Sequence, residues 1–252
     1  MFRRIAVGAA VAAVLPLSLT GCAGEKAAGG AEPAAVRLLA ETARRAGQVE
    51  TYIADMTVES SGPRVTTTVR SRLRPRVAMS AVVSGGKTGC TETRLIDRMA
   101  YCKLDEPAWR PGKPWASASV DGSSPGAGLM ADEVARVRRD DPAEQVKALA
   151  ASTDVRESSE RGRNRHLTGT LTFEQALARF DPKIRPERER TYRTLGVGTT
   201  RFDLWLDPAG LPSKAVMVVS TSTGDLTTTA VYHDYGRPVD VRPPPAAQVA
   251  GF

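Results

Sequence analysis

The sequence predicts an α+β fold in which a strongly curved antiparallel half-barrel sheet carries helices over its concave face. Three observations lead to this prediction. Alternating apolar residues recur in the first and last thirds of the chain, helical patterns lie between them, and 252 residues leave room for a leader and a single domain. Strands on both sides of a helical block favour one sheet whose inner face the helices cover.

The first 21 residues have the pattern of a signal peptide. Two arginines stand at positions 3 and 4, and the apolar run of residues 5–19 is too short to span a bilayer. The run ends in Leu19-Thr20-Gly21-Cys22, which resembles the lipobox of bacterial lipoproteins. That resemblance implies cleavage before Cys22, acylation of its thiol and a lipid anchor on the extracytoplasmic side of the cell membrane. The alternative is an ordinary signal peptide cut near Ala23, with Cys22 incidental.

Residues 22–32 are rich in Ala and Gly, so we expect a flexible tether before a single domain over residues 33–252. An amphipathic helix is predicted from Pro33 to Gly47. In it Val36, Leu39 and Ala43 recur at helical spacing, while charged residues occupy the other side.

Three alternating segments then predict an antiparallel meander over residues 52–58, 65–73 and 77–83. Turn signals at Ser61-Gly62-Pro63 and Gly85-Gly86 separate them. Residues 91–96 and 99–104 predict a hairpin around a turn at Asp97-Arg98. The Pro- and Gly-rich segment 107–128 is expected to be irregular, with Trp109 and Trp115 packed on the edge of the domain.

Helical patterns occupy the middle of the chain. Within residues 129–151, Asp141 is the expected N-cap before Pro142. A strand at residues 163–172 leads into a helix opened by a capping box, Thr172 to Gln175, and ended by Asp181-Pro182. The charged stretch up to Arg193 is expected to be an exposed helix or lid. Strands return at residues 200–206, 213–221 and 226–235, whereas the tail at 238–245 is too proline-rich for a central strand.

Three cysteines are present, and acylation of the first leaves Cys90 and Cys102 as a candidate pair. Export favours a disulfide, and closing so short a loop would add about 3 kcal/mol. Two alternatives stay open. If Asp97-Arg98 is a two-residue turn, Cys102 faces Thr93, so a bridge needs a bulge or a differently centred loop. Otherwise the two thiols remain unbridged.

The formal net charge is +7, with 35 Lys and Arg against 28 Asp and Glu. Because the chain has an export signal and lacks aromatic-rich basic motifs, we expect no nucleic-acid partner. Anionic lipid headgroups or wall polymers are better candidate partners for the positive charge. The simplest interpretation is a solvated basic surface with no specific partner. The basic run at residues 156–165 is read as a solvated strand edge in preference to a headgroup clamp.

Motifs that could carry catalysis fail on physical grounds. Residues 84–88 end like a phosphate-binding loop, but Ala81 stands where the first glycine is needed. Residues 122–126 match the nucleophile pattern around Ser124, yet Pro125 has no N–H to donate to an oxyanion. His166 and His233 lie on separate predicted strands, are expected to be half-exposed, and have no metal-ligand spacing around them. We therefore expect no enzyme, no cofactor and no metal.

Several motifs recur in the order found in one family. Besides the lipobox they are Arg94 to Tyr101, Gly112-Lys113-Pro114-Trp115, Asp141-Pro142, His166 to Thr170, Leu204 to Pro212, Tyr235-Gly236 and Pro238-Val239. Over most of the mature chain they resemble the actinobacterial LppX/LprG-type lipoproteins, relatives of the LolA-like lipoprotein carriers. The resemblance implies a half-barrel with helices over its hollow, and a cavity that holds acylated lipids during passage through the envelope. The chain departs from the family in Cys90, Cys102 and the charged insertion at residues 183–193.

The expected function is that of a monomeric, membrane-anchored cell-envelope lipoprotein that binds, and as a further step transports, a lipid or other lipophilic ligand. Apolar strand faces would line the cavity, although the same residues could form a solid core. The residues expected to line it are Met56, Val58, Val69, Met79, Phe180, Leu204, Val216 and Val218. The alternative is an interaction or sensor lipoprotein that uses the same fold without a bound lipid and has an envelope protein as its partner.

Overall fold

The computed structural model describes residues 34–85, 89–104, 110–120, 141–158, 164–178 and 185–251, without the side chains of residues 187 and 188. The predicted signal peptide, the tether and Cys22 lie outside the described residues. The elements described below all belong to one compact unit of the chain.

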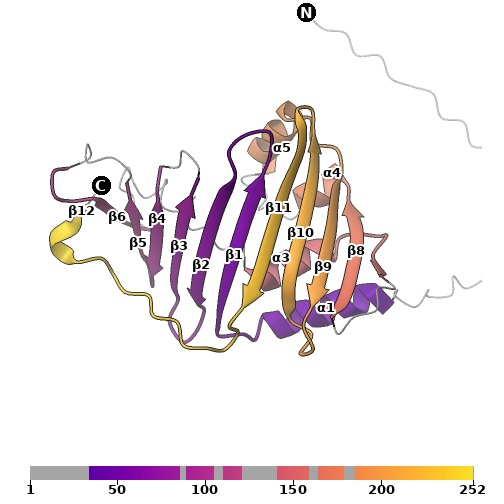
Figure 1. The fold of residues 1–252 in the computed structure, drawn as a ribbon, viewed down its shortest axis with the longest axis horizontal. Coiled ribbons are helices and arrows are strands. Elements are labelled where there is room, and N and C mark those ends of the chain that lie inside the picture. The colour runs from indigo at the N-terminus through magenta and orange to yellow at the C-terminus, as the bar shows by residue number, and fades with distance from the viewer. Residues whose placement is uncertain are drawn as a thin grey trace, which may run out of the picture. The chain divides into compact units, whose positions relative to one another are not determined.

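One curved, unclosed sheet dominates the fold, and among the described residues its strand order is β12-β6-β5-β4-β3-β2-β1-β11-β10-β9-β8-β7. Neighbouring strands are antiparallel except for the parallel pair β12 and β6. Because β1 pairs with both β2 and β11, the N-terminal meander and the C-terminal hairpins meet at the centre of the sheet (Figure 1). The strands are β1 (Thr51–Glu59), β2 (Val65–Arg72), β3 (Ala78–Ser84), β4 (Glu92–Ile96), β5 (Met99–Lys103), β6 (Trp115–Ser119), β7 (Arg156–Glu157), β8 (Arg165–Leu171), β9 (Thr200–Leu206), β10 (Pro212–Thr221), β11 (Gly224–His233) and β12 (Val249–Gly251).

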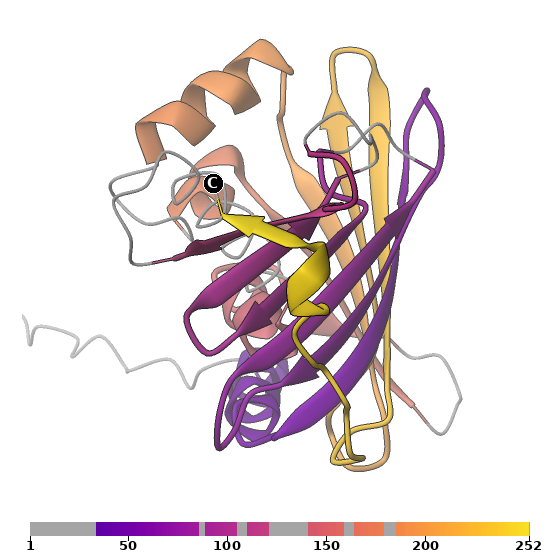
Figure 2. The same ribbon diagram turned by 90° about the vertical axis from the view of Figure 1, so that its left-hand side faces the viewer.

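The helices lie on the concave side of this sheet (Figure 2). They are α1 (Ala34–Ala46), α3 (Pro142–Leu149), α4 (Phe173–Ala178) and α5 (Arg185–Thr194), with a short 3-10 turn, η1 (Ala246–Gln248), near the C-terminus. α1 buries Leu39 and Ala43, and α3 buries Val146 and Leu149, in a core shared with the sheet. The predicted fold class is therefore confirmed.

The caps predicted for two helices are confirmed. Asp141 Oδ1 accepts hydrogen bonds from the backbone N–H groups of Ala143, at 2.8 Å, and Glu144, at 3.3 Å, so it caps α3. Before α4, the Gln175 N–H donates to Thr172 Oγ1 at 3.2 Å while the Thr172 N–H donates to Gln175 Oε1 at 2.8 Å. Each bond satisfies an N–H group that the first helical turn leaves without an internal partner. Residues 129–140, the start of the longer predicted helical region, lie outside the described residues.

The prediction of an irregular segment at residues 107–128 is wrong for residues 115–119, which form β6. Trp115 begins this strand and is followed only by small residues. Its side chain is 4% exposed, with the Arg94 guanidinium 4.7 Å from the ring centroid. β6 is followed in the sheet by a strand from the C-terminal tail. Val239 and Val241 of the tail pack on Ala78, and the chain then forms β12, which pairs with β6. Trp109 lies outside the described residues.

Candidate ligand-binding site

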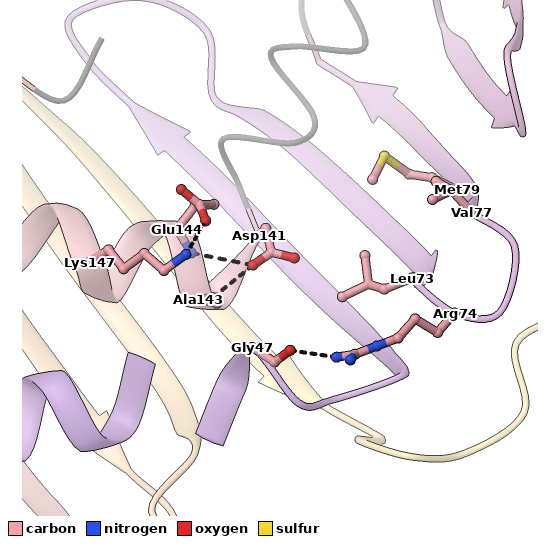
Figure 3. Close-up of a pocket in the computed structure, with 9 residues that line it drawn as sticks. All are labelled: Gly47, Leu73, Arg74, Val77, Met79, Asp141, Ala143, Glu144 and Lys147. Carbon is pink, nitrogen blue, oxygen red and sulfur yellow. Dashed lines mark hydrogen bonds and ion pairs between the residues drawn. The ribbon is translucent and has the colours of Figure 1, made fainter. Parts of the chain in front are cut away.

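A pocket of about 360 Å³ opens between the start of α3, the end of α1 and the connection from β2 to β3 (Figure 3). Its lining comprises Gly47, Leu73, Arg74, Val77, Met79, Asp141, Ala143, Glu144 and Lys147. Segments far apart in the sequence thus form one hollow at the edge of the core.

The floor of this pocket is apolar. Leu73 and Val77 flank the turn between β2 and β3 and are half-buried, and Met79 lies on the concave face of β3 with 3% exposure. Met79 also belongs to the hydrophobic core, against which Leu73 and Val77 pack. The floor is therefore an accessible margin of the core itself.

The rim of the pocket carries charges of both signs. Arg74 Nη2 donates to the backbone carbonyl of Gly47 and, at 3.4 Å, to that of Val49, which ties the turn to the chain after α1. Lys147 Nζ lies 2.6 Å from Glu144 Oε1. Burial raises the pKa of the Asp141 carboxyl, although the N–H donors of α3 act in the opposite direction.

The burial of apolar side chains on the concave face changes along the length of the strands. We call the packed half the region beneath α1 and α3, where Tyr52 and Val69 are 0% exposed and Leu204 is 1% exposed. We call the open half the region near the β1–β2 and β10–β11 turns, where the apolar side chains are only half-buried. The open half consists of Val58, Val65, Val83, Met217, Val219 and Leu226, which the strand registers place on the face that carries Met56.

A second hollow, of about 430 Å³, lies against α5. It is lined by Arg190, Thr191, Thr194 and Leu195, and Leu195 is 46% exposed. The predicted exposed helix before Arg193 is confirmed by α5. α5 thus lines a hollow, and the leucine that directly follows the helix is exposed.

The residues expected to line a cavity separate into several groups. Val69 and Leu204 lie in the packed half, and Met56 is 8% exposed on the same face. Met79 lies in the floor of the pocket, and Val58 lies in the open half. Phe180 lies outside the described residues.

Val216 and Val218 were expected on the concave face, and this expectation is wrong. Val216 pairs with Thr229 and Val218 pairs with Thr227, whereas the concave Met56 pairs with Ala230. Residues directly opposite each other in an antiparallel pair share a face, so the two valines point to the convex side. The concave residues of β10 are Ala215, Met217 and Val219, which pair with concave residues of β11.

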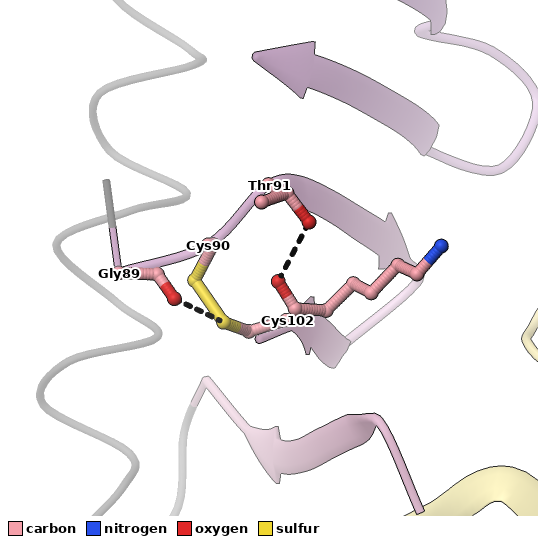
Figure 4. Close-up of a disulfide and its surroundings, with 5 residues drawn as sticks. Gly89, Cys90, Thr91 and Cys102 are labelled. Atoms are coloured by element: carbon pink, nitrogen blue, oxygen red, sulfur yellow. Dashed lines mark hydrogen bonds between the residues drawn. A yellow bond between two sulfur atoms is a disulfide. The ribbon is translucent and has the colours of Figure 1, made fainter. Parts of the chain in front are cut away.

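Cys90 and Cys102 form a disulfide with Cα atoms 5.3 Å apart (Figure 4). The two-residue turn forms as predicted, and Cys102 lies opposite Thr93. An unbroken strand would place Cys90 on the convex face, three residues before Thr93. However, Thr91 N–H donates to the Lys103 carbonyl at 2.8 Å while Glu92 also pairs with Lys103. This extra residue is the bulge that the bridge requires, because it turns Cys90 toward Cys102.

The two histidines differ in burial. His166 is 8% exposed, stacks on Trp205 with ring centroids 4.3 Å apart, and has Nε2 2.8 Å from Asp203 Oδ1, so the expectation of a half-exposed residue is wrong for it. His233 is half-buried between Asp55 and Asp234, at 3.0 and 2.9 Å. Within the described ranges, no group of three His, Cys, Asp or Glu side chains could hold a metal ion. Ser124 and residues 86–88 lie outside those ranges.

Comparisons with known proteins find lipoproteins. No protein-family model matches the chain. A Streptomyces coelicolor protein named "Putative lipoprotein SCO4650" is 31% identical over 172 residues, which cover 66% of this chain and 52% of that protein. An uncharacterized 31.2 kDa protein of Streptomyces griseus is 25% identical over 182 residues, covering 68% and 60%. The chain thus spans about half to three fifths of the length of these curated relatives.

Comparison with solved structures finds two mycobacterial proteins. LprF from Mycobacterium bovis has a TM-score of 0.49 and 15% identity, covering 84% of this chain and 98% of that one. LppX from Mycobacterium tuberculosis has a TM-score of 0.49 and 13% identity, covering 84% and 100%. LppX is described as a lipoprotein, as is the Streptomyces coelicolor relative. Among the described residues, no helix is long and apolar enough to cross a membrane.

Proposed function

We propose that residues 33–252 bind a lipophilic molecule on the concave side of the sheet, in a non-catalytic cell-envelope lipoprotein anchored through acylated Cys22. The observation that carries this proposal is the apolar floor of Leu73, Val77 and Met79 in a hollow of about 360 Å³. Ligand pockets span roughly 300–1,000 Å³, so the volume suits a single alkyl chain better than a bulky lipid with several chains.

The energetics of such binding need no reactive residue. Each methylene transferred from water to an apolar site contributes about 0.8 kcal/mol, and the pocket floor offers contacts on the margin of an existing core. The half-buried valines and Met217 of the open half give further apolar surface on the same face. These features support binding of a lipophilic molecule. Transport would be a further step, in which the bound lipid is released to a membrane.

The test is lipid recovery followed by a binding assay. The domain purified from a bacterial membrane is expected to carry extractable acyl lipid in mass spectrometry, and the delipidated domain is expected to bind a fluorescent fatty acid. Val77→Phe should fill the pocket and weaken that binding about tenfold. Val218→Phe makes the same change on the convex face and should leave binding unaltered. Repeated recovery of empty protein that binds no fatty acid would overturn the proposal.

The packed half favours one alternative, an interaction or sensor lipoprotein that binds an envelope protein. Leu39, Tyr52 and Val69 are each 0% exposed, so the protein's own side chains fill the centre of the concave side. This alternative predicts that an envelope protein co-purifies with the wild type and equally with Val77→Phe. Lipid binding that is lost in Val77→Phe alone would argue against it.

A further inference from the structure

One cation of the pocket, Arg74, is paired with no carboxylate among the described residues. Arg74 is exposed and lies beside Leu73 and across from Met79 (Figure 3). Its hydrogen bonds to the described residues use Nη2 alone, toward the carbonyls of Gly47 and Val49. No ion pair joins it to a carboxylate of the described residues. Nε and Nη1 therefore remain as donors, and each can form a charge-assisted hydrogen bond with a carboxylate or phosphate oxygen.

The two acids of the opposite wall are already engaged. Glu144 pairs with Lys147 at 2.6 Å. Asp141 accepts the first N–H groups of α3, and its pKa is raised by burial and lowered by the nearby charge of Lys147. The carboxylates on this wall thus already have partners at the start of α3 or within it. Arg74 is therefore the cation of the pocket lining that can bind a ligand.

The turn that carries Arg74 is basic on both sides of it. Arg72 and Arg76 flank it, and Arg72 Nε donates to the Arg76 carbonyl at 3.2 Å. Neither side chain forms an ion pair within the described part of the chain. A cluster of like charges beside an apolar floor raises the local concentration of anions and orients an approaching amphiphile with its charged end toward the turn.

We propose that the pocket selects an anionic amphiphile, with its carboxylate or phosphate bound by Arg74 and its alkyl chain over Leu73, Val77 and Met79. This inference deepens the proposed function and rests on it. It names the ligand class by two features that lie side by side, an available guanidinium and an apolar floor.

The experiment compares a fluorescent fatty acid with its methyl ester, which has the same chain and no charge, on the delipidated domain. The wild type should bind the acid about tenfold more tightly than the ester, the scale of one charge-assisted hydrogen-bonded contact. Arg74→Gln should remove this preference while the affinity for the ester stays unchanged. Arg76→Gln is the matched control, since it removes the same charge outside the pocket lining, and it should keep most of the preference.

The outcomes separate this inference from the proposed function. Equal affinities for acid and ester in the wild type would overturn the inference while leaving lipid binding intact. If neither probe binds, both proposals fail. If Arg74→Gln and Arg76→Gln lose the preference for the acid equally, the specific role of Arg74 is overturned. The preference would then come from the summed positive charge of the turn. Displacement of the fatty acid by millimolar acetate would show a site for small anions and would also overturn the assignment to an amphiphile.

Discussion

The packed half and the open half of the concave face use the same strands and the same kinds of side chain, yet only one of them is closed. Val69 on β2 is 0% exposed beneath the helices, whereas Val65 on the same strand and the same face is half-buried. Leu39 of α1 and Val146 of α3 belong to the same buried cluster as Val69, so the helices account for the closure of the packed half. An apolar strand face therefore becomes core or accessible surface according to what covers it.

The largest effect is expected from truncating matched apolar residues in the two halves. Leu204→Ala should lower the free energy of unfolding by about 2–5 kcal/mol, because it leaves a cavity in the packed half. Met217→Ala should cost about 1 kcal/mol or less, because a half-buried side chain leaves less empty space behind. Urea unfolding monitored by circular dichroism measures both. Equal costs would mean that the open half is as tightly packed as the rest.

The disulfide between Cys90 and Cys102 is expected to stabilise the β4–β5 hairpin. Cys102 is 0% exposed, and the bridge spans 12 positions of sequence. Replacing both cysteines by serine should cost about 3 kcal/mol, mostly through the greater freedom of the unfolded chain. The comparison of wild type with and without reductant in the same urea titration checks this value. No change on reduction would contradict the expected contribution.

The start of α3 forms the boundary between the packed half and the pocket. Asp141→Ala removes the cap of α3 and should cost about 1 kcal/mol of stability. Asp141→Asn retains an oxygen acceptor at the same position and should cost less. Hydrogen exchange of the Ala143 and Glu144 amides reports the loss directly. Unchanged exchange in Asp141→Ala would show that another group supports the helix start.

The smallest effect is expected on the convex face, away from both halves. The hydrogen bond to Asp55 and the neighbouring Asp234 raise the pKa of His233. The folded-state pKa thus exceeds the unfolded value of about 6.5, so the stabilisation is complete below pH 6.5 and is lost as the pH rises through the folded-state pKa. His233 is partly exposed, so we expect less than about 1 kcal/mol. His233→Gln should weaken the pH dependence of the free energy of unfolding between pH 6 and 8. A pH dependence equal to that of the wild type would exclude His233 as its source.

The sequence was informative where one face of an element is apolar and the other is polar. The alternation in Tyr52, Ala54 and Met56 identified the concave side of β1, and the Asp141-Pro142 signal located the start of α3. In β10, however, Ala215 to Val219 is apolar on both faces. Periodicity cannot choose between such faces, and only the register with β9 and β11 excludes Val216 and Val218 from the concave side.

The pocket had no local signal in the sequence. Arg74 and Asp141 line it from segments far apart in the chain. The sequence marks Asp141 only as a helix cap and gives no reason to single out Arg74. The disulfide depended on a bulge at Thr91, where a single extra residue reverses the face on which Cys90 lies. Such features arise from how strands pair in three dimensions, so they become visible only in the folded chain.

Photocrosslinking with a diazirine-labelled fatty acid tests the central claim most directly, because it records where an alkyl chain lies. We expect adducts at Leu73, Val77 and Met79, strongly reduced in Val77→Phe and unchanged in Val218→Phe. Adducts confined to the convex face around Val216, or no adducts at saturating ligand, would contradict it.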